Sequence, residues 1–81
     1  MGGRLTLYGR SYCHLCEDME KALRGVQEAL GFDFTVVNID ADPAAEALYD
    51  ELVPVLTDAE GREICHYFLD LEALRTRLAV K

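Results

Sequence analysis

A chain of 81 residues is long enough for one domain, spanning residues 1–81, and too short for two. Its 51% of hydrophobic and 28% of charged residues are typical of a globular protein rather than a disordered one. The net charge of −7 opposes binding to nucleic acid and to anionic membrane surfaces, so neither is expected as a partner.

The N-terminal segment Met1–Leu5 lacks the long apolar run of a secretion signal. No apolar stretch elsewhere approaches the roughly 20 residues that a membrane-spanning helix needs. We therefore expect a cytoplasmic protein that works as a monomer.

The first third of the chain predicts a strand, a long helix and a second strand. The apolar segment Leu5–Tyr8 is followed by a helical pattern that begins near His14. Gly31 is a typical helix stop, and Phe32–Ile39 is rich in β-branched and aromatic residues. The helix between the two strands is long enough to connect them in parallel. Its buried face is expected to carry Leu15, Cys16, Met19, Leu23, Val26 and Leu30.

A short helix and a third strand are predicted next. Asp42 and Pro43 suit the N-cap and the first helical position, and the helix is expected to end near Leu52. Strand character resumes at Val53–Thr57.

The last part of the chain predicts a hairpin and a final helix. Asp58–Gly61 has the composition of a tight turn, and Glu63–Phe68 is expected to pair antiparallel with the strand before it. Asp70 suits the N-cap of a helix over Leu71–Leu78. The order β-α-β-α-β-β-α predicts an α/β fold with a mixed four-stranded sheet and three helices.

The segment Cys13-His14-Leu15-Cys16 carries the clearest chemical signal. Two thiols three residues apart at the start of a helix can approach closely enough to form a disulfide. The free N–H groups of the helix start favour the thiolate, which is the reactive form of cysteine. Because Cys13 lies at the very start and Cys16 within the first turn, we expect Cys13 to attack and Cys16 to resolve.

This order of elements, the Cys-X-X-Cys at the first helix and the Val53–Pro54 dipeptide resemble the thioredoxin-like fold. Within it, the chain is similar to the small bacterial glutaredoxin-like proteins. The resemblance implies that Cys13 is the nucleophile and Cys16 the resolving thiol. It also implies a cis Val53–Pro54 peptide bond whose backbone binds an incoming peptide or thiol.

Two further positions match the family by their place in the sequence. Arg10 stands where the family has a lysine that assists the thiolate and binds glutathione, and Tyr12 stands immediately before the nucleophile. Both are therefore expected to contact substrate. The glycine-rich motif that binds the carboxylate of glutathione is replaced here by Phe68–Asp70. No bound cofactor is expected, and the missing motif disfavours glutathione as a co-substrate.

His14 and Arg10 are candidates for lowering the pKa of the Cys13 thiol. A protonated imidazole or a fixed guanidinium near the sulfur stabilises its negative charge. Each side chain also has the alternative of being a solvated surface group. We expect the replacement His14→Ala to raise the pKa of the Cys13 thiol in a thiolate absorbance titration.

A zinc site is an alternative use of the cysteines. Cys13, Cys16, Cys65 and His66 are suitable ligand types if one tetrahedron can hold them. The predicted fold sets the fourth strand, which carries Cys65 and His66, at the edge of the sheet and away from the cysteine pair. We therefore expect no metal site, and one of these two side chains to be buried.

The sequence thus predicts a thiol–disulfide oxidoreductase that uses Cys13 and Cys16. Its expected partners are protein or small-molecule disulfides and thiols, together with a reductant that the sequence does not identify. One alternative is a non-catalytic binding or redox-sensing module of the same fold. A carrier of a metal or an iron–sulfur cluster is the other.

Overall fold

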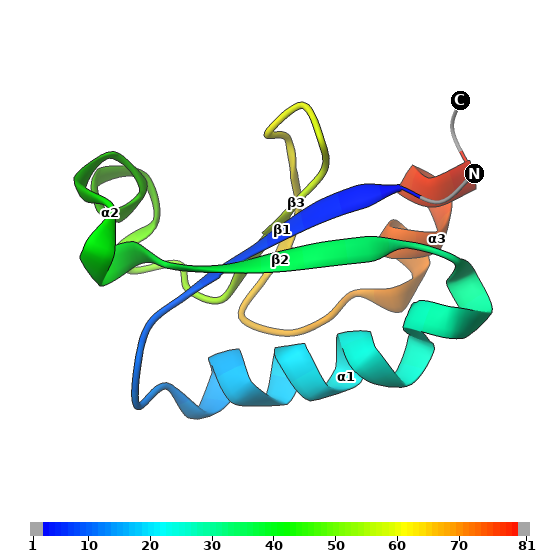
Figure 1. Cartoon of the computed structure of the whole chain (residues 1–81), viewed down its shortest axis with the longest axis horizontal. Helices are drawn as coiled ribbons and strands as arrows, with labels where there is room; N and C mark the ends of the chain where they lie inside the picture. Colours follow the sequence, from blue (N-terminus) through cyan, green and yellow to red (C-terminus); the bar gives the residue numbers. More distant parts are fainter. Residues whose placement is uncertain (1–2, 80–81) are drawn as a thin grey trace.

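The computed structural model, which describes residues 3–79, is built on a mixed four-stranded sheet with the order β2-β1-β3-β4 (Figure 1). The central strand β1 runs parallel to β2 and antiparallel to β3, and β3 runs antiparallel to the edge strand β4. This is the expected α/β fold with a thioredoxin-like order of elements. The strands are β1 (Arg4–Gly9), β2 (Asp33–Asn38), β3 (Val55–Thr57) and β4 (Glu63–His66).

Two helices cover one face of the sheet and the third covers the other (Figure 1). They are α1 (His14–Leu30), α2 (Pro43–Tyr49) and α3 (Leu71–Ala79), with a short 3₁₀ turn η1 (Ile39–Ala41) before α2. On the opposite face, the rings of Tyr8 and Tyr49 stack with centroids 4.7 Å apart, which holds α2 to β1. The core shared by α1, α3 and the sheet includes Leu5, Leu7, Met19, Leu23, Leu56 and Leu74.

The helices begin and end at residues whose chemistry suits those positions. The carboxylate of Asp42 accepts hydrogen bonds from the N–H groups of the first turn of α2, and Asp70 does the same for α3. Gly31 ends α1 in the left-handed conformation, with φ of 70°. Within residues 3–79, no helix has both the length and the apolar character needed to cross a bilayer.

Helix α2 ends at Tyr49, three residues before the end expected near Leu52. The N–H of Leu52 donates to the carbonyl of Tyr49, three residues back rather than four, at 2.9 Å, so the α-helical pattern is not continued. Further along, the nitrogen of Pro54 carries no hydrogen and cannot donate to the carbonyl of Asp50. Instead, the Asp50 carbonyl accepts a hydrogen bond of 3.3 Å from the guanidinium of Arg10. A side chain from the β1–α1 loop therefore replaces the missing backbone donor.

The second, third and fourth strands are also shorter than expected. β2 stops at Asn38 because Ile39 already belongs to η1, whose first turn the Asn38 side chain caps. β3 begins at Val55, directly after Pro54, and β4 ends at His66. Tyr67 adopts a left-handed φ of 65°, which extended strands do not contain, and its N–H donates to the carbonyl of Pro54 at 2.9 Å.

Candidate functional site

Cys13 occupies the N-cap position of α1. Its backbone is extended, with φ of −111° and ψ of 109°, and its sulfur accepts a hydrogen bond from the N–H of Cys16 at 3.2 Å. The sulfur therefore takes the place that hydroxyl or carboxylate oxygens hold at many helix starts. Cys13 is partly exposed, and N–H groups at a helix start generally favour a thiolate over a thiol.

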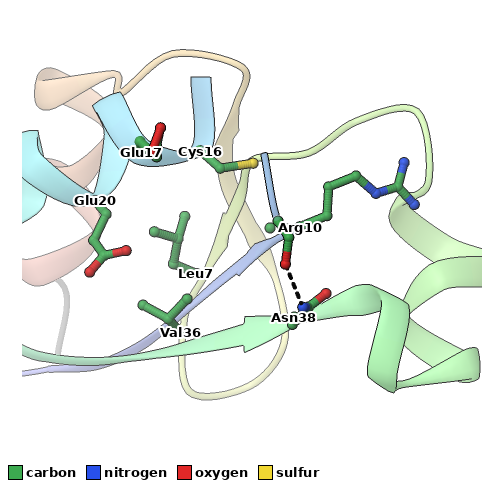
Figure 2. A pocket seen from close by; sticks show the side chains of 9 residues that line it. Leu7, Arg10, Cys16, Glu17, Glu20, Val36 and Asn38 are labelled. Atoms are coloured by element: carbon green, nitrogen blue, oxygen red, sulfur yellow. Dashed lines mark hydrogen bonds between the residues drawn. The ribbon is translucent and has the colours of Figure 1, made fainter. Parts of the chain in front are cut away.

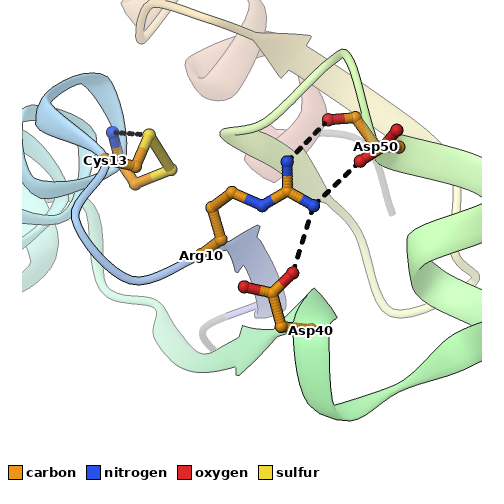
Figure 3. Close-up of a disulfide and its surroundings, with 5 residues drawn as sticks. Arg10, Cys13, Asp40 and Asp50 are labelled. Carbon is orange, nitrogen blue, oxygen red and sulfur yellow. Dashed lines mark hydrogen bonds and ion pairs between the residues drawn. A yellow bond between two sulfur atoms is a disulfide. The ribbon is translucent and has the colours of Figure 1, made fainter.

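Cys16 lies in the first turn of α1 and is only 8% exposed. A disulfide joins it to Cys13, with the two Cα atoms 5.2 Å apart (Figure 3). The close approach of β1 to Cys16 favours glycine at position 9, because a Cβ atom there would lie 3.1 Å from the Cys16 sulfur, a tight contact. Cys13 is the more exposed cysteine of the pair and is also the one that the sequence predicts to be the nucleophile. The roles of nucleophile for Cys13 and resolving thiol for Cys16 stay predictions.

Pro54 lies at the same end of the sheet as the cysteine pair. The Val53–Pro54 peptide bond is cis, Pro54 is buried and Val53 is half-buried. In the β1–β3 register Tyr8 pairs with Val55, so one further step along both strands sets Pro54 opposite Gly9. Gly9 also lies close to Cys16, since a Cβ atom added at Gly9 would be 3.1 Å from the Cys16 sulfur. The site thus combines a redox pair with the strand end that is expected to bind substrate.

The guanidinium of Arg10 turns away from the cysteine pair and toward α2 (Figure 3). Its Nη2 atom lies 2.8 Å from a carboxylate oxygen of Asp50, 3.1 Å from Asp40 and 3.8 Å from Glu46. The hydrogen bond to the Asp50 side chain, together with Asp40, raises the pKa of Arg10 above its ordinary value although burial opposes this. The structure therefore places the charge of Arg10 among three carboxylates, and its expected roles toward thiolate and substrate stay predictions.

Asn38 connects the end of β2 to the loop that precedes the cysteine pair. Its amide oxygen accepts from the N–H of Asp40 at 2.9 Å, and its amide nitrogen donates to the hydroxyl of Ser11 at 3.3 Å (Figure 2). Together with Arg10, this contact holds the β1–α1 loop against η1. Sequence reasoning did not identify Asn38, Asp40 or Asp50, because no local pattern connects them to the cysteines.

A cavity of about 190 Å³ adjoins the pair on the side of β2 (Figure 2). Cys16 forms part of its wall, Leu7 and Val36 supply apolar side chains, and α1 contributes the acidic residues Glu17 and Glu20. Sequence reasoning also missed this cavity, since its wall combines residues from β1, α1 and β2.

Tyr12 and His14 flank Cys13 and are both exposed. Tyr12 has a left-handed φ of 58°, a conformation that costs a residue with a side chain about 1–2 kcal/mol. His14 is the first residue of α1. Their side chains are thus open to an incoming molecule, and the contributions expected from them stay predictions.

Cys65 and His66 lie on the edge strand β4, as expected, and Cys65 is the buried one of the two. Burial raises the pKa of the Cys65 thiol above its ordinary value. The imidazole of His66 is exposed and contacts a carboxylate oxygen of Glu63 at 2.6 Å. In the described part of the chain, no three histidine, cysteine or acidic side chains come together in a way that could hold a metal ion.

The fold and the position of the cysteine pair define a class: small proteins of thioredoxin-like fold with Cys-X-X-Cys at the start of the first helix. Residues 4–79 match the glutaredoxin-like domain family (DUF836). The chain therefore belongs to this family of glutaredoxin-like proteins, which is the group that the sequence resembles.

Solved structures agree with this assignment. The solution NMR structure of a protein from Nitrosomonas europaea is 41% identical, with a TM-score of 0.87 over 98% of this chain and 94% of that one. The crystal structure of a protein from X. campestris is 40% identical, with a TM-score of 0.65 over 90% of this chain and 92% of that one. A malarial protein, 15% identical over 99% of this chain and 100% of that one, has a TM-score of 0.71 and shares the fold. None of the curated proteins compared with the chain matches it.

Proposed function

We propose that this protein is a thiol–disulfide oxidoreductase in which Cys13 is the nucleophile and Cys16 the resolving thiol. The observation that carries the proposal is the position of Cys13: a partly exposed residue at the N-cap of α1, joined by a disulfide to the buried Cys16 in the first turn of the helix. Exposure gives a substrate access to Cys13, and burial of Cys16 protects the second thiol until it is needed.

The reaction has two exchange steps. The Cys13 thiolate attacks one sulfur of a substrate disulfide, forms a mixed disulfide and releases the other sulfur as a thiolate. The Cys16 thiolate then attacks the Cys13 sulfur and releases the second substrate sulfur. Two electrons pass from the protein dithiol to the substrate, both released thiolates take up protons according to their pKa, and the protein ends with the Cys13–Cys16 disulfide. Two external thiols, or one dithiol, must reduce this disulfide by the same two exchange steps before the next cycle, and they leave as a disulfide.

A single-turnover experiment tests the proposal without knowledge of the natural reductant. The protein is reduced with dithiothreitol, freed of it and mixed with a peptide disulfide, and the released thiol is measured over time. We expect Cys13→Ser to abolish release, and Cys16→Ser to accumulate a mixed disulfide that mass spectrometry detects. The control is Cys65→Ala, which removes the third, buried thiol and should leave the rate unchanged.

The result also separates the proposal from its main alternative. A binding or redox-sensing module would bind a partner and form the Cys13–Cys16 disulfide slowly, without accelerating release from a substrate over the rate of free dithiothreitol. Equal residual activity in Cys13→Ser and Cys16→Ser would contradict the division of roles. We propose that the protein works in the cytoplasm, where thiols are kept reduced.

A further inference from the structure

The cavity beside Cys16 has the size of one amino-acid side chain. Sites that enclose whole drug-sized ligands generally measure about 300–1,000 Å³. The cavity measures about 190 Å³, so a tripeptide thiol such as glutathione is too large to lie within it. The volume of the cavity is a better match for a single side chain, next to the reacting cysteine of a substrate.

The wall of the cavity combines apolar surface with carboxylates (Figure 2). Leu7 belongs to the core, and Val36 is 46% exposed, so it offers apolar surface that no other element covers. Glu20 lies 2.8 Å from Arg24, whereas Glu17 forms none of the ion pairs seen within residues 3–79. A side chain with a long aliphatic stem and a positive end satisfies both kinds of surface.

The guanidinium of Arg10 does not occupy the place in the cavity where a positively charged substrate side chain would bind. Arg10 contributes to the rim of the cavity, but its guanidinium points away from Glu17 and Glu20, toward the carboxylates near α2 (Figures 2 and 3). An anionic substrate therefore finds no unpaired cation at Arg10, and a cationic substrate meets little repulsion from it.

We infer that the substrate of the cysteine pair is a polypeptide disulfide with a lysine or arginine next to its cysteine, and that this basic side chain binds in the cavity beside Cys16. The inference rests on the proposed function. A substrate sulfur bonded to Cys13 lies about 2 Å from the Cys13 sulfur, and Cys16, the disulfide partner of Cys13, lines the cavity, so a neighbouring side chain can reach the cavity. The exchange itself proceeds as described above, with the protein dithiol as the reductant.

Three synthetic peptide disulfides that differ at one position test the inference. The residue next to the cysteine is lysine, glutamine or glutamate, and each peptide is mixed with the prereduced protein under single-turnover conditions at 0.02 and 0.15 M salt. Rates with dithiothreitol correct for differences in intrinsic reactivity. We expect the lysine peptide to react on the order of tenfold faster than the glutamate peptide at low salt, with a smaller ratio at higher salt.

Two variants of α1 show whether the cavity is responsible. Glu17→Gln removes a carboxylate from the cavity wall and should reduce the ratio of lysine to glutamate rates to about twofold. Asp18→Asn removes the same charge from the same helical turn outside the cavity and should keep most of the ratio. Both changes affect the reactivity of Cys13 toward all three peptides, so the ratio is the informative quantity.

The outcomes distinguish the two proposals. If the protein reduces all three peptides at equal corrected rates, the inferred substrate class is wrong and the oxidoreductase function stands. If Asp18→Asn lowers the ratio as much as Glu17→Gln, selection comes from overall charge and the cavity assignment is overturned. If none of the peptides is reduced faster than by dithiothreitol, the proposed function fails, and the inference fails with it.

Discussion

The guanidinium of Arg10 lies 2.8 Å from the carboxylate of Asp50, forty positions further along the chain, and also donates to its backbone carbonyl. One side chain thereby fixes the loop before the cysteine pair and completes the end of α2. In related proteins, a basic residue at this position is expected to act on the thiolate and on glutathione. The carboxylates around Arg10 favour a positioning role in this chain.

The first prediction concerns Arg10→Ala. Because the guanidinium is paired with carboxylates, its removal should change the rate of Cys13 alkylation by iodoacetamide by less than about twofold. It should also lower the urea midpoint of unfolding, since the loop loses its contact with α2. A large fall in the alkylation rate without loss of stability would instead support the direct role in thiolate stabilisation that the sequence predicts.

The second prediction uses two glycines as a matched pair. Gly9→Ala places a methyl group 3.1 Å from the Cys16 sulfur and should lower the free energy of unfolding by about 1–3 kcal/mol. Gly25→Ala adds a methyl group within α1 that meets nothing within 4 Å and should raise it by about 0.5–1 kcal/mol. Urea denaturation of both variants measures the difference, and effects of the same sign would contradict the packing described around Gly9.

The third prediction concerns Asp58 in the β3–β4 turn. Burial pushes the pKa of this carboxyl up, but hydrogen bonds from the N–H of Arg62, the guanidinium of Arg77 and the N–H of Glu60 outweigh it and hold the pKa below its ordinary value. A lowered pKa in the folded state stabilises the protein above the unfolded pKa, near 4, and this stability is lost as pH falls through the folded value.

The replacement Asp58→Asn should therefore lower stability at pH 7 and have a smaller effect as the pH falls below about 4. Urea denaturation of both proteins from pH 7 to pH 2.5 measures this. Glu60→Gln serves as the control, because only the backbone N–H of that residue contacts Asp58. A difference between Asp58→Asn and the parent protein that stays constant with pH would contradict the assignment.

The fourth prediction concerns Tyr12, whose ring is fully exposed beside Cys13. If the ring packs against a substrate polypeptide, Tyr12→Ala should raise KM for a peptide disulfide roughly threefold to tenfold and leave kcat unchanged. Hydroxyethyl disulfide, which is too small to reach the ring, should react at the same rate with both proteins. A loss of kcat with both substrates would indicate that Tyr12 shapes the loop rather than contacting substrate.

The β1–α1–β2 unit could be predicted almost to the residue from the sequence. Its hydrophobic period changes from that of a strand to that of a helix and back, and Gly31 marks the helix end. The boundaries near Pro54 could not be predicted as well, because the end of α2 depends on how its last carbonyl groups find donors: the Tyr49 carbonyl accepts from Leu52, and the Asp50 carbonyl accepts from a donor forty positions away. That donor is Arg10, and only the folded chain brings the two together.

The cysteine pair could be predicted for a similar reason, since its spacing and its place at a helix start are local. The cavity could not, because Leu7, Glu17 and Val36 come from three elements and none of them has an unusual local sequence. Arg10 is an intermediate case: its proximity to the cysteines along the chain is evident, but the direction of its side chain depends on carboxylates at positions 40, 46 and 50.

The burial of Cys65 has a practical consequence for handling the protein. A thiol reagent applied to the folded, reduced molecule should label Cys13 rapidly, whereas Cys16 and Cys65, each only 8% exposed, should react much more slowly until the protein is denatured. Air oxidation should accordingly form the intramolecular disulfide between Cys13 and Cys16 without linking two copies of the protein through Cys65. Samples of the oxidised protein are thus expected to run at the same size with and without reductant.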